Sequence, residues 1–178
     1  MVKTRGFTLI ESVIAMVIMA VAMLSLSSFL FPQLSRSADP HYQTRAAALG
    51  QSIMTKMLAS KFDHHSDDLG AVRCSTLDGS SNSCTLTADL GDEGESPQNF
   101  NDVDDFSGCW VPNGSASCGD LYALISQGEE SGYHNFKLDI NVAYSPSAPA
   151  EPTLKQLSVV VSAGSQTPIK LIAYRGNY

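Results

Sequence analysis

The first 31 residues are dominated by an uncharged, apolar run. Residues 12–31 carry no charge, and they are preceded by Glu11 and by the basic residues Lys3 and Arg5. Because about 20 apolar residues are enough for a helix to cross a bilayer, this pattern predicts a membrane-spanning helix over residues 7–31. The pattern also places one carboxylate near the end of that span.

A second helical pattern occupies residues 40–62. Asp39 is expected to cap its start and Pro40 to lie in its first turn, while Pro32 is expected to kink or fray the preceding helix. Gly50 is a further soft spot in the pattern. Apolar residues recur on one broad face at helical spacing. They are Tyr42, Ala46, Leu49, Ile53 and Met57, with Met54, Leu58 and Phe62 alongside.

Strand patterns dominate the C-terminal third. The stretch NFKLDINVAY alternates between apolar and polar residues from Phe136 to Tyr144. LKQLSVVVSA and IKLIAY flank GSQTP, which is typical of an antiparallel hairpin. LYALISQ, at residues 121–127, is predicted to be another strand. Together these patterns predict an α+β fold, in which a long N-terminal hydrophobic helix packs on an antiparallel β-sheet within residues 121–178.

The intervening residues 63–120 are rich in Gly, Ser, Asn and Asp and are predicted to be mostly loop. Short strands are expected only at residues 71–75 and 85–87. A structureless stretch of this length is unusual in a compact domain unless it is functional or cross-linked.

The four cysteines supply such cross-links. Each pair brackets turn-forming residues, so we predict the disulfides Cys74–Cys84 and Cys109–Cys118, although four cysteines allow three connectivities. In an oxidising compartment each disulfide stabilises by about 2–4 kcal/mol. The alternative is a zinc site, which lacks the usual short spacing between ligands. Trp110 is interpreted as a ring that covers a disulfide rather than as a ligand platform.

Charge is unevenly distributed along the chain. The net charge of −7 and the pI of about 4.9 argue against binding to nucleic acid. No Lys or Arg lies between Arg73 and Lys137, and such a stretch is interpreted first as solvated loop and second as a cation site. The acidic residues of this interval are Asp78, Asp89, Asp92, Glu93, Glu95, Asp102, Asp104, Asp105, Asp120, Glu129 and Glu130.

Two groups of side chains are candidate metal ligands. Asp102, Asp104 and Asp105 are candidates for calcium, but their spacing does not match an EF-hand, and a surface loop that presents Phe106 to the core is the preferred interpretation. No other cofactor is expected, and no nucleophile motif points to an enzyme. The second group is interpreted as solvated loop, since adjacent histidines point in different directions; it comprises His64, His65, Asp67 and Asp68.

The N-terminal segment has three interpretations. A cleaved secretory signal has a shorter apolar core and a small-residue cleavage site, and this run is too long and lacks that site. An ordinary membrane anchor fits the length but gives no reason for Glu11, because a carboxylate in the bilayer centre costs about 2.5–3.5 kcal/mol. The third interpretation follows from a resemblance in the residues that precede and include Glu11.

The stretch KTRGFTLIES resembles the cleavage and methylation site of type IV prepilins and pseudopilins. The resemblance implies that a prepilin peptidase cuts after Gly6 and methylates the new N-terminal residue, Phe7. Residues 1–6 are then a leader that stays cytoplasmic, in agreement with the positive-inside rule.

This processing gives Glu11 a role. After cleavage, Phe7 carries an α-ammonium group and lies one helical turn from Glu11. A neighbouring helix can offer its own ammonium to Glu11, and in an apolar bundle a wrong register leaves a charge unpaired. Glu11 is therefore expected to set the register of helix-on-helix assembly.

A second resemblance narrows the class. Phe-Pro-Gln, Arg-Ser-Ala-x-Pro and Arg-Ala-Ala-x-Leu-Gly-Gln, together with the segment at 102–106, resemble the minor pilins of the mannose-sensitive haemagglutinin (MSHA) pilus. The resemblance implies an inner-membrane, single-pass protein with a periplasmic, pilin-like head at residues 32–178, which later enters an extracellular pilus.

The resemblance also implies the partners, which are prepilin peptidase, the inner-membrane assembly platform, the major pilin and other minor pilins. The expected role is in assembly initiation or at the pilus tip. The alternatives are a minor pseudopilin of a type II secretion system, and a tip adhesin that contacts carbohydrate through the acidic 89–105 loop or Trp110.

Overall fold

The fold is given by a computed structural model, which describes residues 8–37, 39–67, 71–75, 83–126, 132–145 and 152–178. The chain divides into two compact units, residues 1–41 and residues 42–178, and each is described by itself.

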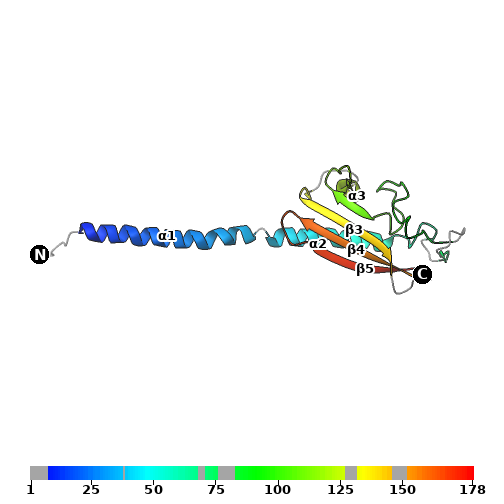
Figure 1. The fold of residues 1–178 in the computed structure, drawn as a ribbon, viewed down its shortest axis with the longest axis horizontal. Coiled ribbons are helices and arrows are strands. Elements are labelled where there is room, and N and C mark those ends of the chain that lie inside the picture. Colours follow the sequence, from blue (N-terminus) through cyan, green and yellow to red (C-terminus); the bar gives the residue numbers. More distant parts are fainter. Residues whose placement is uncertain (1–7, 38, 68–70, 76–82, 127–131, 146–151) are drawn as a thin grey trace. The chain divides into compact units, whose positions relative to one another are not determined.

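Unit 1 contains helix α1 (Leu9–Ser37) (Figure 1). Thr8 caps its start, because the backbone N–H of Glu11 points at the Thr8 carbonyl oxygen at 3.1 Å and at its hydroxyl at 3.4 Å. The helix continues through Pro32, so the expected fraying there is wrong. A single missing hydrogen bond does not end a helix whose neighbouring turns keep theirs.

Helix α2 (Asp39–Ala59) begins one residue before the predicted residue 40 and ends three residues before the predicted residue 62. Its apolar stripe is buried at Ala46, Leu49, Ile53, Met54 and Met57. Helix α2 continues through Gly50. A Cβ atom at Gly50 would lie 2.8 Å from Leu171 Cδ1, so this glycine lets α2 approach the sheet closely.

Five strands form one sheet in the order β2-β1-β3-β4-β5. All neighbouring strands are antiparallel except β1 and β2, which run parallel, so the sheet is mixed rather than wholly antiparallel. The predicted C-terminal hairpin is confirmed as β4 and β5. The strands are β1 (Gly108–Val111), β2 (Gly119–Asp120), β3 (Phe136–Tyr144), β4 (Leu154–Ala163) and β5 (Ile169–Gly176).

The predicted strand at residues 121–127 is wrong, since Leu121–Ser126 form the short helix α3. Asp120 Oδ1 accepts a hydrogen bond from the backbone N–H of Tyr122 at 2.9 Å, which is typical of a helix start. The strands expected at residues 71–75 and 85–87 are also wrong, because both segments are loop or turn.

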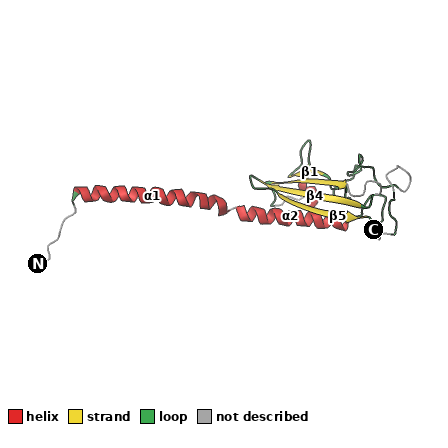
Figure 2. Ribbon diagram, turned by 60° about the horizontal axis from the view of Figure 1, so that its bottom comes forward, coloured by secondary structure: helices red, strands yellow, loops and turns green. Residues whose placement is uncertain are grey.

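The core of unit 2 lies between α2 and the sheet (Figure 2). Every second residue of β4 faces this core, from Lys155 to Ala163. The loop residues Val103 and Phe106 are also fully buried, which anchors the segment after residue 100 to the core. The loops therefore belong to the packed structure of the head.

Candidate functional site

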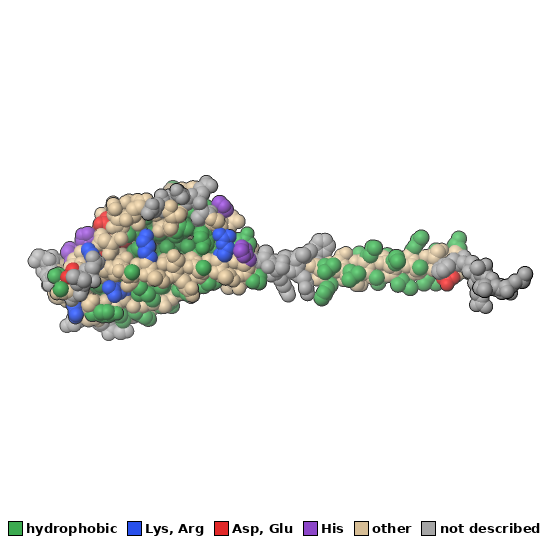
Figure 3. All heavy atoms as spheres, turned by 180° about the vertical axis from the view of Figure 1, so that it is seen from behind, with side chains coloured by type: hydrophobic (Ala, Val, Ile, Leu, Met, Phe, Trp, Pro, Cys, Tyr) green, Lys and Arg blue, Asp and Glu red, His purple; other side chains and the backbone are tan. Residues whose placement is uncertain are grey.

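The surface of α1 carries apolar side chains on all sides from Leu9 to Leu30. Hydrophobic side chains are distributed along the helix (Figure 3), and each large apolar side chain described in it is exposed, from Leu9 at 83% to Leu30 at 53%. Residues Leu9–Leu30 are long and apolar enough to cross a membrane. A helix that is apolar all round requires lipid or other helices around it, so this segment is a single membrane anchor.

Glu11 is the only charged residue in this span. It lies in the first turn of α1, where a carboxylate interacts favourably with the helix dipole, and it is exposed. The predicted cleavage and methylation residues, Gly6 and Phe7, lie outside the described residues, as do Lys3 and Arg5.

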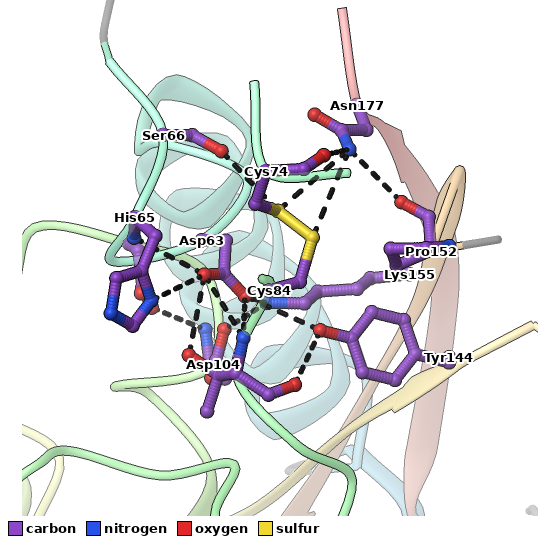
Figure 4. Close-up of polar contacts among 12 residues, drawn as sticks. Asp63, His65, Ser66, Cys74, Cys84, Asp104, Tyr144, Pro152, Lys155 and Asn177 are labelled. Atoms are coloured by element: carbon purple, nitrogen blue, oxygen red, sulfur yellow. Dashed lines mark hydrogen bonds and ion pairs between the residues drawn. A yellow bond between two sulfur atoms is a disulfide. The ribbon is translucent and has the colours of Figure 1, made fainter. Parts of the chain in front are cut away.

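The head contains a buried lysine network, formed by Lys155, Asp63 and Asp104 (Figure 4). Lys155 Nζ lies 3.0 Å from Asp63 Oδ2 and 2.5 Å from Asp104 Oδ1, and all three side chains are fully buried. The ammonium also faces the rings of Phe62 and Tyr144, at 4.8 and 5.3 Å from their centroids. Lys155 therefore joins β4 to two loop segments in the interior.

Asp63 is held by several donors besides Lys155. The backbone N–H of Thr85 donates to Asp63 Oδ2 at 3.0 Å, and the Tyr144 hydroxyl donates to the same oxygen at 3.3 Å. Burial alone would raise the pKa of Asp63, but the charge and hydrogen bond of Lys155, together with the backbone N–H groups of His65 and Thr85, lower it. Asp63 is therefore the ionised partner of Lys155.

The acidic turn, residues 101–106, is folded around its own carboxylates. Asp102 Oδ1 accepts hydrogen bonds from the backbone N–H groups of Asp104 and Asp105, at 3.0 and 3.3 Å. Asp105 Oδ2 accepts from the N–H groups of Asn101 and Asp102, at 2.6 and 2.9 Å. A parallel bridge between Lys61 and Asp102 ties the turn to the segment after α2.

The surface-loop interpretation of Asp102, Asp104 and Asp105 is wrong, because all three are fully buried. The same turn does present Phe106 to the core, as predicted. The three carboxylates turn inward because their oxygens satisfy backbone N–H groups and Lys155, which a hydrophobic-polar pattern cannot reveal.

Glu93 lies close to the acidic turn. Its carboxyl group interacts with that of Asp105, and burial, this contact and the charge of Asp104 raise its pKa to about 8. Burial and the charge of Asp104 likewise raise the pKa of Asp102 to about 8. Burial raises the pKa of Asp104, although Lys155 opposes this shift. The carboxylates of the lysine network, the acidic turn and Glu93 therefore carry more negative charge than Lys155 alone can neutralise.

Both predicted disulfides are present, Cys74–Cys84 and Cys109–Cys118, and no cysteine is free within the described residues. The zinc alternative is therefore wrong for these cysteines. Trp110 is 6% exposed, and its ring lies against Gly119, next to Cys118, while its Nε1–H donates to the Phe106 carbonyl at 3.0 Å.

The exposed side chains of His64 and His65 lie next to the lysine network and the acidic turn. His65 Nδ1 lies 3.3 Å from Asp63 Oδ1, and a nitrogen of His64 lies within 4.8 Å of carboxylate oxygens of Glu93 and Asp102. Asp67 is described and Asp68 lies outside the described residues. His64 and His65 also border a pocket of about 330 Å³ that extends to Leu86 and Asp89.

Sequence reasoning missed Lys155, Asp63 and Glu93 as site residues. The signal for Lys155 was present, since strand alternation places it on the same face as Leu157, Val159 and Val161. Asp63 and Glu93 carry no such signal, because each lies in a loop without periodicity.

Comparison with known proteins identifies the N-terminal segment. The family model described as the prokaryotic N-terminal methylation motif matches residues 1–27. No curated protein and no solved structure matches the chain. The chain thus combines the methylation motif with an apolar anchor helix and an α+β head that carries two disulfides, and this is a type IV pilin-like architecture.

Proposed function

We propose that this chain is a minor subunit of a type IV pilus of the MSHA kind, most like the D minor pilin. A prepilin peptidase would cut after Gly6 and methylate Phe7, and the subunit would enter the fibre by helix-on-helix packing. Its head would then face other subunits in assembly initiation or at the tip. The proposed role is structural, not enzymatic.

The observation that carries this proposal is the exposed apolar surface of α1 behind the methylation motif. In a lone subunit this surface can be covered by lipid, and in a filament by neighbouring helices. Glu11 is then the one charged residue of this span that distinguishes registers, because its carboxylate needs an ammonium partner within the apolar bundle.

Glu11 gives the test of the assembly step. We expect Glu11→Ala to leave membrane insertion intact and to remove the protein from sheared pili, as measured by immunoblot of membrane and pilus fractions. Ser12→Ala is a matched control in the same turn, since the Ser12 hydroxyl donates to the Leu9 carbonyl of its own helix, at 2.7 Å. Normal incorporation of Glu11→Ala would refute the proposed register role.

Processing has a separate test. Replacing Gly6 with leucine should block cleavage, so that mass spectrometry of the purified chain finds a precursor that still begins at Met1. A chain that begins at Met1 and still enters pili normally would contradict the proposed maturation.

Two alternatives share part of this evidence. A minor pseudopilin of a type II secretion system would use the same helix, and crosslinking to a co-expressed pilus major subunit or to a secretion pseudopilin separates the two roles. A carbohydrate-binding tip adhesin cannot use Trp110 as an exposed stacking platform, because that ring is buried.

A further inference from the structure

Three buried carboxylates in the acidic turn each leave one oxygen unused. Asp102 and Asp105 use one oxygen for backbone N–H groups, and Asp104 uses one for Lys155. The remaining oxygens are Asp102 Oδ2, Asp104 Oδ2 and Asp105 Oδ1. Within the described part of the chain, no donor reaches any of them, although all three atoms are buried. Such atoms are uncommon in folded proteins, and a bound water or ion is one partner that would satisfy them.

The carboxyl groups of these three residues lie beside a fourth carboxyl group, that of Glu93. The carboxyl groups of Asp102 and Asp104 interact directly, and so do those of Glu93 and Asp105. Oxygens of Glu93 and Asp102 also lie within 4.8 Å of each other. Glu93, Asp102, Asp104 and Asp105 therefore form one four-carboxylate cluster, to which two separate turns contribute.

The cluster carries too much negative charge for its surroundings. Lys155 is the lysine that contacts it, and its charge is already shared between Asp63 and Asp104. The unused oxygens of Asp102, Asp104 and Asp105 are buried away from water, and a bound divalent cation would supply the positive charge that they lack.

We propose that the four-carboxylate cluster binds a calcium ion through Asp102 Oδ2, Asp104 Oδ2, Asp105 Oδ1 and the carboxylate of Glu93. Calcium accepts six to eight oxygen ligands in flexible geometries, whereas magnesium demands a nearly ideal octahedron. Both described cysteine pairs are disulfides, so thiolates, which softer metals favour, do not contribute.

The ion would join two segments of the head that are separate in the sequence, the turn at residues 92–95 and the acidic turn. Glu93 lies in the turn at residues 92–95, where Asp92 Oδ1 accepts a hydrogen bond from the N–H of Gly94 at 3.1 Å. The acidic turn is linked to β4 by the ion pair between Asp104 and Lys155. Calcium would therefore hold the loop-rich end of the head in one conformation. This inference concerns the head alone and does not depend on the proposed pilus role.

Equilibrium dialysis with radioactive calcium tests the proposal on the purified full-length chain in detergent, after removal of metals with EDTA. We expect one ion per chain at about 1 mM free calcium, as for extracellular calcium modules, and a higher melting temperature with calcium than with EDTA. Magnesium at the same concentration should give a smaller shift.

Two isosteric variants locate the ion. Glu93→Gln alters an exposed side chain, and Asp102→Asn keeps the oxygen that accepts the backbone hydrogen bonds. Each should weaken calcium binding by about tenfold or more. Asp139→Asn, which removes one charge from β3 at a half-exposed position, is the control and should bind normally. Absence of binding by the wild-type chain, equal binding by all variants, or stronger stabilisation by magnesium would each overturn the proposal.

Discussion

Lys155 Nζ and Asp63 Oδ2 lie 3.0 Å apart, and both side chains are fully buried. The pair joins the core face of β4 to the loop that follows α2, 92 residues away in the sequence. Removing two charges from water is costly, and the pair compensates only because Asp63 also accepts hydrogen bonds from Thr85 and Tyr144. The network therefore makes the position of this loop depend on a single lysine.

Replacement of Lys155 with methionine should destabilise the head by about 3–5 kcal/mol, because it leaves two buried carboxylates without a cation. Urea unfolding of the full-length chain, followed by near-UV circular dichroism, measures this change. Lys137→Met is the control, since its ion pair with Asp139 is about half exposed and should contribute at most about 1 kcal/mol. Equal effects of the two substitutions would show that the buried network does not stabilise the fold.

The lowered pKa of Asp63 predicts a specific loss of stability in acid. Its carboxylate stabilises the folded state above the ordinary value of 3.8, and that contribution is lost as the pH falls through the lowered folded value. Asp102 and Asp104, whose pKa values are raised, are protonated in both the folded and the unfolded state in this range, so they do not contribute. The free energy of unfolding should fall below pH 3.8, by at most about 1.4 kcal/mol per pH unit for this one group.

The check on this assignment is a carbon NMR titration of the side-chain carboxyl groups in EDTA. A midpoint for Asp63 at or above 3.8 would contradict the role given to Lys155. Asp139, which is half exposed, serves as the reference carboxylate in the same sample.

The sequence predicted those elements whose pattern is long and periodic. Helix α1 was predicted from its long apolar run, the buried stripe of α2 from its helical spacing, and the strand β3 from its alternation. The strands β4 and β5 were predicted from two apolar stretches that flank a turn. Helix α3 was mistaken for a strand because its six residues are too few to separate the two periods. The apolar pattern therefore predicted helix α2 and the three long strands of the head.

The contacts of Lys155 and of the acidic turn could not be predicted in the same way. Alternation in β4 shows that Lys155 faces the core, but not which carboxylate meets it there. Asp102 and Asp105 look like surface residues because the pattern does not show that their oxygens satisfy backbone N–H groups. Partners of this kind depend on tertiary contacts between loops, which carry no period.

The two disulfides should differ in their contribution to stability. They close loops of similar length, with sequence separations of 10 and 9, so chain entropy alone gives each about 2–3 kcal/mol. Cys74–Cys84 is also buried, and Asn177 Nδ2 donates to the Cys74 carbonyl at 2.8 Å. We expect the double alanine variant at Cys74 and Cys84 to lose more stability in urea than the one at Cys109 and Cys118. Equal losses would mean that the buried surroundings add nothing.

Gly119 is required by the ring of Trp110. A Cβ atom at Gly119 would lie 2.5 Å from the Trp110 ring, closer than atoms tolerate, and the buried ring cannot move outward without breaking its hydrogen bond to Phe106. Gly119→Ala should therefore destabilise the head by about 1–3 kcal/mol and change the fluorescence of Trp110, the single tryptophan of the chain.

Gly91→Ala is the matched control, because nothing lies within 4 Å of the added Cβ atom there and the backbone has no unusual conformation. It should leave both the free energy of unfolding and the tryptophan spectrum unchanged. If Gly119→Ala behaves like Gly91→Ala, then β2 is free to move away from Trp110. In that case the parallel pairing of β1 with β2 does not hold the second disulfide loop against the core.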